Sequence, residues 1–301
     1  MNIAIQGGEG SYHQEAAENH IATVSPYIGE DHDIVFVPTF PEVFDGLAAG
    51  KYNRAVVAIA NNRVGFIPEP HTRLIRDSGS FRIVGETYVR VDHQLLGLPG
   101  ARLSDIEEVH SQAPAIAQCL EYLSKRLPNA SIVEQSDTAL SAQLVSRRGN
   151  PHSAAIASKR AGIIHGLVPI ESSIQDDRDN ITRFVVLART GDDVPELGVP
   201  NKTTWLLDTG QQAGALVSAL MPFKEARISI ESLHSLFVPN SAFDMQFWME
   251  FDAGVQDERM VGIRQSLSEI GCSVKSLGSY VSRPVPMSNL EQSNTNKEKV
   301  A

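Results

Sequence analysis

The first sixty residues alternate between short apolar runs and helix-like stretches, and this alternation limits the fold more than any other feature. The apolar run at residues 2–6 ends in a glycine-rich turn at residues 7–10, which precedes the helix-prone residues 14–18. Two further apolar runs follow at residues 34–37 and 55–60, with an amphipathic stretch between them. Strands that alternate with helices are typical of a parallel sheet covered by helices, so we expect an α/β domain.

The same alternation continues from about residue 81 to residue 150. We expect strands at residues 82–91, 107–110 and 131–134. Asp137 is a residue type that caps helix N-termini, and the stretch it opens ends in two arginines and Gly149, which suit the last turn and the end of a helix. The middle of the chain therefore continues the α/β pattern.

The pattern changes after residues 191–201, a short polar segment that contains proline, and we place a domain boundary there. Residues 202–283 follow the order strand, helix, strand, strand, helix, strand, which predicts a ferredoxin-like sandwich. Its third strand alternates strictly, which indicates one inward-facing side; the alternating residues are Phe243, Met245, Phe247, Met249 and Phe251. The polar tail, residues 284–301, is typical of a disordered segment.

The composition excludes several classes of function. At 301 residues with 42% hydrophobic residues, the chain can bury a core in each of two domains. Its net charge of −10 gives no long-range attraction to nucleic acid or to an anionic membrane, and we expect neither as a partner. The two cysteines lack the spacing of a disulfide framework, and the first residues lack the pattern of a secretory signal. We therefore expect a cytoplasmic protein.

Residues 180–184, Asn-Ile-Thr-Arg-Phe, lie at the entrance of an apolar strand and combine a hydroxyl with a fixed positive charge. An arginine presents a planar fork of donors that suits a carboxylate, and a neighbouring threonine can give a proton or a hydrogen bond to a group held there. That combination suits a small acidic substrate. Taken alone, the five residues fit an ordinary strand entrance better, with the arginine turned to solvent.

Three other segments place polar groups at strand ends. Residues 7–12 either hold an anion at the unpaired N–H groups of a helix start or form a plain turn. Asn61 and Asn62 follow a strand, where α/β proteins bind ligands, but this is also turn chemistry. Ser111 either contacts a ligand or caps the next helix. The nine histidines form no metal-ligand pattern, so we expect no metal site.

Together these segments resemble the prephenate dehydratase family, in order and as far as about residue 283. The Gly-x-x-Gly-Ser-Tyr at residues 7–12 and the Asn-x-x-x-Gly at residues 61–65 are similar to two family motifs. Residues 111–119 resemble the family's Ser-His-Pro-Gln-Ala-Leu-x-Gln-Cys, and the series continues with Asp-Thr-Ala and Ala-Ala-Ile-Ala-Ser at residues 137–139 and 154–158. The most specific match is the triplet Thr-Arg-Phe, which ends the segment 180–184 described above.

The chain also departs from the family at identifiable positions. The catalytic part has Ala60 for a glutamate, Asn62 for a serine, Gln112 for a histidine and Ala113 for a proline. These exchanges change which groups can donate or accept protons near the site. The C-terminal module resembles the ACT domain that senses phenylalanine in this family, with a matching Gly-Ala-Leu at residues 214–216. The family's Glu-Ser-Arg-Pro motif corresponds to residues 234–237, where only the serine, Ser235, is kept.

The resemblance implies a two-lobed, periplasmic-binding-protein-like catalytic domain at residues 1–190, with the substrate cleft between the lobes. One lobe would comprise residues 1–80 and 160–190, and the other residues 81–159. The implied reaction converts prephenate into phenylpyruvate in phenylalanine biosynthesis, with loss of water and carbon dioxide and without a cofactor. Thr182 would donate the proton; the expected substrate-binding residues are Ser11, Asn61, Ser111, Arg183 and Phe184.

The resemblance further implies feedback regulation through the ACT domain. Phenylalanine would be the effector, bound at Gly214, Ala215, Leu216 and Ser235, and pairing of ACT sheets edge to edge would give a homodimer or homotetramer. Two alternatives remain open. A related prephenate decarboxylase shares the fold, but those relatives lack the Thr-Arg-Phe triplet. A non-catalytic sensor is the other alternative, and its best arguments are Ala60 and Gln112.

Overall fold

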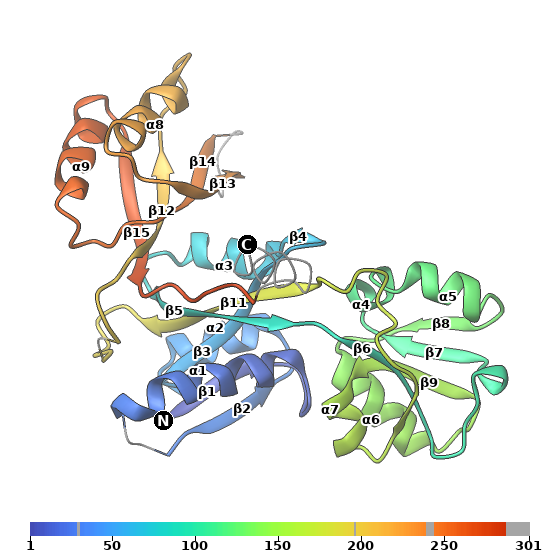
Figure 1. The fold of residues 1–301 in the computed structure, drawn as a ribbon. Coiled ribbons are helices and arrows are strands. Elements are labelled where there is room, and N and C mark those ends of the chain that lie inside the picture. Colours follow the sequence, from blue (N-terminus) through green and yellow to red (C-terminus); the bar gives the residue numbers. More distant parts are fainter. Residues whose placement is uncertain (29–30, 196, 239–243, 287–301) are drawn as a thin grey trace, which may run out of the picture.

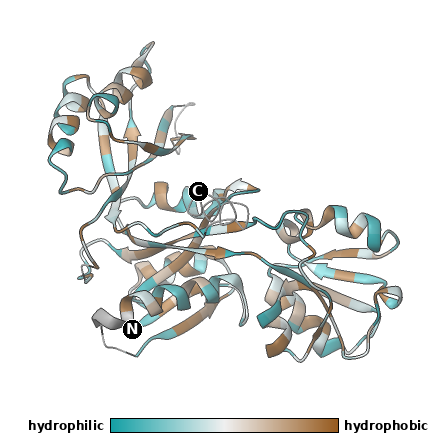
Figure 2. Cartoon of the chain, in the orientation of Figure 1, coloured by the Kyte–Doolittle hydropathy of each residue, from teal (hydrophilic) through white to brown (hydrophobic). Residues whose placement is uncertain are grey.

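The computed structural model describes residues 1–28, 31–195, 197–238 and 244–286, and Figure 1 shows three bodies, each built on one sheet. Two α/β lobes lie side by side, and a smaller C-terminal module stands against the first lobe. Figure 2 shows hydrophobic residues concentrated along the strands of these sheets. Among the described residues, no helix is long and apolar enough to cross a membrane. The expected disordered tail lies, from residue 287 onwards, outside the described residues.

The first lobe contains a mixed sheet rather than the expected parallel one. Strands β1 and β3 run parallel with β2, but β11, which returns from the second lobe, runs antiparallel to both of its neighbours, β3 and β5. The strand order is β2 (Asp33–Val37), β1 (Asn2–Gln6), β3 (Arg54–Asn61), β11 (Ile181–Arg189) and β5 (Phe81–Arg90), with β4 (Gly65–Phe66) paired to β3. The helices are α1 (Tyr12–Ile28), α2 (Phe40–Ala48) and α3 (Pro68–Arg76).

The sequence of the first lobe explains where its helices begin and what they bury. Thr39 caps α2 by accepting a hydrogen bond from the backbone N–H of Glu42, a residue pair typical of a capping box. The apolar face of α2 then packs Phe44 and Leu47 against the sheet, where both are fully buried. These contacts hold the strands whose carboxyl ends form the site.

The second lobe has five strands, of which the sequence predicted two, at residues 107–110 and 131–134. The expected helix after Asp137 is confirmed: Asp137 caps it by accepting from the N–H of Leu140, and Gly149 ends it in the left-handed conformation, with φ of 63°. The strand order is β10 (Val168–Glu171), β6 (His93–Gly97), β9 (Ser153–Ser158), β7 (Glu108–Ser111) and β8 (Ser131–Glu134). The helices are α4 (Ala113–Ala117), α5 (Leu120–Arg126), α6 (Thr138–Arg148) and α7 (Lys159–Ile164), with a 3-10 turn at Leu103–Asp105.

The strand pairings correct the expected lobe boundaries. Strand β5 belongs to the first sheet because it pairs along its length with β11, so the first lobe extends to residue 90 rather than residue 80. Strand β10 belongs to the second sheet because it pairs with β6, and α7 packs in the same lobe. The chain crosses between the lobes twice, after β5 and before β11, and the two crossings are tied by the bond from the N–H of Val91 to the carbonyl of Asn180.

The C-terminal module confirms the predicted βαββαβ order. Its antiparallel sheet runs β13 (Ile230–Phe237), β14 (Met245–Phe251), β12 (Lys202–Asp208) and β15 (Ser273–Tyr280), with helices α8 (Ala215–Glu225) and α9 (Arg259–Glu269) on one face. The predicted alternation holds for Met249 and Phe251, which pack in the core beneath the helices together with Phe247. Phe243 lies outside the described residues.

The other face of this sheet packs on the first lobe. Leu206, Trp248 and Leu277 belong to the same buried cluster as Phe81 and Ile83 of β5. Gly278 makes this approach close, because a Cβ atom at that position would lie 2.1 Å from the carbonyl oxygen of Ile83. The C-terminal module and the first lobe therefore share a hydrophobic core.

Candidate active site

A cavity of about 170 Å³ lies between the two lobes at the carboxyl ends of the central strands. The first lobe contributes residues from the ends of β1 and β3 and from the start of β11, and the second lobe contributes the starts of α4 and α6. The described lining contains no lysine and no arginine. It consists of Gln6, Ser11, Tyr12, His13, Phe40, Ala58, Asn61, Val64, Ile67, Val91, His93, Gln112, Pro114, Ala115, Gln118, Asp137, Thr138, Thr182 and Phe184.

Thr182 and Asn61 form the centre of this cavity wall. They are direct partners in the pairing of β11 with β3, and the side-chain amide of Asn61 donates to the hydroxyl oxygen of Thr182 over 2.9 Å. The orientation of that amide is fixed, because its carbonyl oxygen accepts from the backbone N–H groups of Arg63 and Val64 at 2.8 and 3.1 Å. Among the described contacts Thr182 Oγ1 serves as an acceptor, so its own hydrogen is available to a ligand.

A series of hydrogen-bonded polar side chains runs from Asn61 across the two segments that connect the lobes. Asn61 also donates to Asn180 over 2.7 Å, and Asn180 donates to the Oε1 atom of Gln118 over 2.7 Å. Because that oxygen can only accept, the Nε2 atom of His93, 2.9 Å away, carries the hydrogen of the ring. These contacts connect both lobes, and both segments that link them, to the part of the cavity wall that contains Thr182.

The two histidines of the lining are neutral. Burial, the largest influence, lowers the pKa of His93 to about 4, against the opposing effect of its bond to Gln118. Burial also lowers the pKa of His13 to about 3. His13 Nε2 accepts from the backbone N–H of Ala58, and its ring meets that of Phe184 edge to face at 5.0 Å. The cavity therefore offers neutral donors and aromatic surface rather than positive side chains.

The glycine-rich turn next to the cavity is bonded to the second lobe. Ser11 caps α1 by accepting from the N–H of Gln14, and it lines the cavity as expected from its position. Asp137, at the start of α6, accepts from the N–H of Gly8 over 3.3 Å, and Ser158 donates to the carbonyl of Gly10 over 2.6 Å. The pKa of Asp137 is raised chiefly by burial, although backbone N–H groups oppose this.

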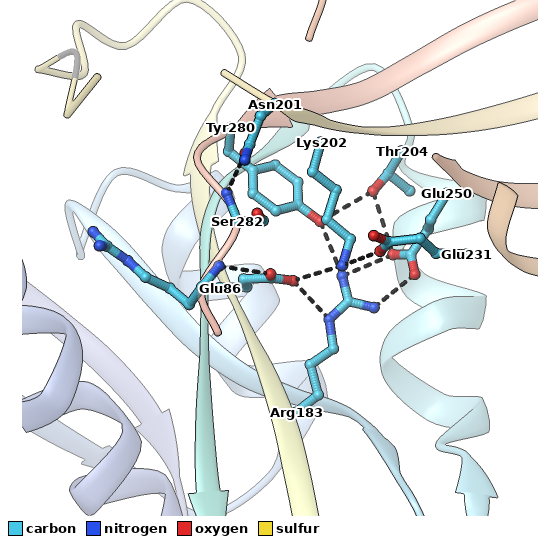
Figure 3. Close-up of polar contacts among 10 residues, drawn as sticks. Glu86, Arg183, Asn201, Lys202, Thr204, Glu231, Glu250, Tyr280 and Ser282 are labelled. Carbon is cyan, nitrogen blue, oxygen red and sulfur yellow. Dashed lines mark hydrogen bonds and ion pairs between the residues drawn. The ribbon is translucent and has the colours of Figure 1, made fainter. Parts of the chain in front are cut away.

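The expected site residues divide into three groups. Thr182, Asn61, Ser11 and Phe184 lie together in the lining. Ser111 does not: it is fully buried and donates to the carbonyl of Ile156 over 2.7 Å, because β9 covers the end of β7. Arg183 points to the opposite face of β11 and is held by Glu86 and Glu250 (Figure 3).

Sequence reasoning missed several residues of the lining as site residues. Gln118, Asp137 and Thr138 lay within segments that carried the family resemblance, so their positions in those motifs could have indicated them. His13 and His93 gave no such signal, because a single histidine on a strand or helix is usually a core residue. Among the described residues, no group of three histidines, cysteines or carboxylates is placed to hold a metal ion.

A second cavity, of about 330 Å³, lies in the C-terminal module where α8 begins. The expected effector residues Gly214, Ala215 and Leu216 line it, together with Met245 and Phe247 of β14. Gly214 adopts φ of 82°, which favours glycine at this turn. Ser235 lies outside the described lining, on the exposed strand β13, where it pairs with Phe247.

The fold and the cavity define a two-lobed α/β enzyme domain joined to a ferredoxin-like module. A family model described as prephenate dehydratase matches residues 3–192. The bifunctional chorismate mutase/prephenate dehydratase of Escherichia coli K12 is 34% identical over 287 residues, which cover 94% of this chain and 71% of that protein. The chain therefore belongs to the prephenate dehydratase family and is a dehydratase of the lyase class.

A plant relative and two solved structures are also similar to this chain. The arogenate dehydratase/prephenate dehydratase 1 of Arabidopsis thaliana is 31% identical, over 93% of this chain and 72% of that protein. The prephenate dehydratase of Arthrobacter aurescens in complex with L-Phe has the same fold, with a TM-score of 0.80 at 23% identity over 100% of this chain and 99% of that chain. A structure described as GqqA, a novel type of quorum quenching acylase, is 27% identical, with a TM-score of 0.79 over 94% of this chain and 99% of that one.

Proposed function

We propose that this protein converts prephenate into phenylpyruvate and that Thr182 is the proton donor. The observation that carries the proposal is the Thr182 hydroxyl in the interlobe cavity, with its oxygen held by Asn61 and its hydrogen available. A hydroxyl oxygen that accepts a hydrogen bond becomes a better donor, because the two bonds polarise one another. This arrangement prepares Thr182 to act as a general acid.

In the proposed reaction Thr182 gives its proton to the ring hydroxyl of prephenate, which leaves as water. The bond between the ring and its carboxylate breaks, carbon dioxide leaves, and the electron pair of that bond completes the aromatic ring. The threonine oxygen then recovers a proton from solvent. A threonine hydroxyl is a weak acid, but aromatisation and decarboxylation make the elimination strongly downhill, so one well-placed donor suffices.

We infer that the two carboxylates of prephenate are bound by neutral donors. The described lining has no cationic side chain, but α1 begins at the cavity and its first turn presents N–H groups with partial positive charge. Gln112 and Gln118 add side-chain amides. Phe184 and Phe40 give the apolar wall against which the flat ring of the product would lie.

The departures from the family pattern are compatible with turnover. Ala60 is the backbone partner of Arg183 in the pairing of β3 with β11, and it lies outside the described lining of the interlobe cavity. Asn62 secures the start of β11, because it accepts from the N–H of Ile181 at 2.8 Å and donates to the carbonyl of Asp179. Gln112, which does line the cavity, keeps a hydrogen-bonding side chain where the family has histidine.

Regulation and assembly complete the proposal. Phenylalanine would bind in the cavity at Gly214, because its lining joins backbone N–H groups at the start of α8 to the apolar side chains Met245 and Phe247. Within the described residues, β13 pairs on one side only, so a second copy could extend the sheet and bring its Ser235 near this cavity. A homodimer or homotetramer in the cytoplasm is the expected form.

Product analysis tests the catalytic proposal. Purified full-length protein is incubated with prephenate, and the products are separated and identified. Phenylpyruvate with one equivalent of carbon dioxide supports the dehydratase. Loss of carbon dioxide without an aromatic product would instead identify a prephenate decarboxylase, and binding without any product would identify a sensor.

A further inference from the structure

Arg183 lies one residue from Thr182 but serves the opposite side of the sheet. Successive side chains of a strand point to opposite faces, so Thr182 faces the cavity and Arg183 faces the C-terminal module. The guanidinium donates to both carboxylate oxygens of Glu250, at 2.6 and 3.0 Å, and to the hydroxyl of Tyr280 at 2.9 Å. Its Nε donates to Glu86 of β5 at 2.8 Å (Figure 3).

These groups form a buried cluster of opposite charges. The side chains of Glu86 and Glu250 are 0% and 3% exposed, and Lys202, which pairs with Glu86 at 3.3 Å, is 6% exposed. Two cations thus face two buried carboxylates, and the partly exposed Glu231 adds a third carboxylate 2.6 Å from Lys202. Burial opposes the charge on Arg183, but Glu250, Tyr280 and Glu86 outweigh it and raise its pKa well above the ordinary value. Arg183 and Glu250 therefore keep their opposite charges across the physiological range.

The strand that carries Thr182 and Arg183 has a register shift directly after these two residues. The pairing of β11 with β3 is regular at Thr182 and Arg183, but its register shifts directly afterwards, because Phe184 pairs with Ala58 and Ile59 has no partner in the ladder. A bulge of this kind lets a strand bend locally. A movement of the side-chain anchors of Arg183 would therefore bend the strand next to the Thr182 hydroxyl.

The same cluster is joined to the second cavity by two strands. Strand β14 carries Phe247, which lines that cavity, and Glu250, which is three residues or about 10 Å further along. Strand β12 carries Thr204, whose hydroxyl lies 3.4 Å from Glu250, and it leads directly into the lining residue Thr209. A ligand that shifts these strands would move the partner of Arg183.

We propose that Glu250 is a positioning residue for the dehydratase reaction, which holds Thr182 in place through Arg183 and transmits the state of the C-terminal cavity to it. This inference rests on the proposed function and adds the route by which that site is regulated. It gives Arg183 a role between the two cavities in place of the expected contact with a substrate carboxylate.

The decisive variant is Glu250→Gln in the full chain, with Glu231→Gln as its matched control. Glu231 lies in the same module and loses the same charge, but it pairs with Lys202 and is 42% exposed. Turnover number and KM for prephenate are measured with and without L-phenylalanine, and phenylalanine binding is measured by calorimetry. We expect Glu250→Gln to lower the turnover number about 10-fold to 100-fold with KM within about threefold, as for an interaction that matters in the transition state.

The response of turnover to phenylalanine is a second readout, which a purely structural role of Glu250 would not change. Glu250→Gln should still bind phenylalanine with an affinity within about threefold of the wild type, but its turnover should no longer respond to it. Glu231→Gln should keep both the turnover and the response. If Glu250→Gln does not fold by circular dichroism, Arg183→Lys replaces it, because lysine keeps the charge and loses the fork.

The outcomes separate this inference from the proposed function. A wild type that forms no phenylpyruvate overturns the proposed function and this inference with it. An active wild type whose folded Glu250→Gln variant keeps normal turnover and a normal response overturns this inference alone. Equal losses in Glu250→Gln and Glu231→Gln would also overturn it, and a wild type indifferent to phenylalanine overturns its regulatory half.

Discussion

The amide nitrogen of Asn61 donates to the hydroxyl oxygen of Thr182 over 2.9 Å, between two residues that are direct partners in neighbouring strands. Because the carbonyl oxygen of Asn61 is taken up by two backbone N–H groups, the amide cannot turn around without losing both bonds. The pair therefore fixes the direction of hydrogen bonding: the Thr182 hydroxyl accepts a bond from the protein and can donate one to the ligand. Most of the expected behaviour of this site follows from that polarity.

Thr182→Ala should lower the turnover number for prephenate by about 100-fold or more, which is the usual contribution of a general acid. Thr182→Ser keeps the hydroxyl and serves as the control, with turnover within about tenfold of the wild type. Steady-state kinetics gives both values, and circular dichroism checks the fold. Normal turnover in the alanine variant would remove Thr182 from the mechanism.

Asn61→Asp should reverse the polarity of the pair. A carboxylate at this position accepts a hydrogen bond, so the Thr182 proton would turn toward the protein and away from the substrate. We expect a loss of about 10-fold to 100-fold in turnover number. The control is Asn53→Asp, which makes the same chemical change at an exposed residue just before β3 begins. This variant should leave the turnover number unchanged. Equal rates for the two variants would contradict the proposed role of Asn61.

The pH dependence of catalysis should lack a histidine step. Because burial lowers the pKa of His13 to about 3 and that of His93 to about 4, both rings are neutral throughout the range above pH 6. We expect kcat/KM for prephenate to show no transition near the ordinary histidine pKa between pH 6 and pH 9. A transition that disappears in a His13→Asn or His93→Asn variant would show that one of these rings titrates during catalysis.

The stability conferred by Glu250 should depend on pH in a defined direction. Burial raises the pKa of Glu250, but Arg183 outweighs this effect and the net pKa is lowered from its ordinary value of 4.5. The stabilisation is therefore present above that ordinary value and is lost as the pH falls through the folded-state value. Urea unfolding should show Glu250→Gln less stable by about 3–5 kcal/mol at pH 7, with the difference shrinking in acid.

Glu231→Gln is again the control for stability. Its carboxylate is 42% exposed, and Lys202 keeps Glu86 as a partner when Glu231 is lost, so the loss should be about 1 kcal/mol or less. A difference between wild type and Glu250→Gln that grew toward low pH would have the wrong sign and would refute the assigned direction of the pKa shift.

Contacts across the lobes should contribute to substrate binding. Ser158→Ala removes the buried bond to the carbonyl of Gly10, in the turn before α1, together with the cap that Ser158 provides for α7. We expect KM for prephenate to rise about fivefold, which corresponds to about 1 kcal/mol for one such bond, with a small change in turnover number. Arg160→Gln removes the exposed pair with Glu18 between the same lobes and should change KM less than twofold. A KM for Ser158→Ala equal to that of the wild type would show that this bond does not contribute to substrate binding.

The sequence predicted the architecture because its signals were local. The strand and turn pattern of the first sixty residues, the cap at Asp137 and the βαββαβ order depend on periodicity and on residues close in the chain. The lobe boundaries depended on pairing between distant strands, and the first lobe proved to include β5 because β11 returns beside it. The apolar pattern of a strand does not show which distant strand it pairs with, so the sequence alone could not place this boundary.

The lining of the interlobe cavity was predicted in part for a similar reason. Thr182 and Asn61 were identifiable because both stand at strand ends and within recognisable motifs. The alternation of side chains along a strand already implied that Arg183 would face away from Thr182, but the sequence did not show what covered the far face. Ser111 was misplaced because its position at a strand end suggested access, whereas the carbonyl of Ile156 on the adjacent strand takes its hydroxyl.

The hydrophobic core that joins β5 to the C-terminal sheet has a consequence for how this protein could be divided or recombined. A catalytic fragment cut near residue 192 would lose the layer that covers Phe81 and Ile83, and it would expose Arg183 and Glu86 without their partners. The two parts are therefore not interchangeable cassettes. Grafting this regulatory module onto another enzyme, or evolving the catalytic lobes without it, would first require a new surface on the far side of the strand that carries Thr182.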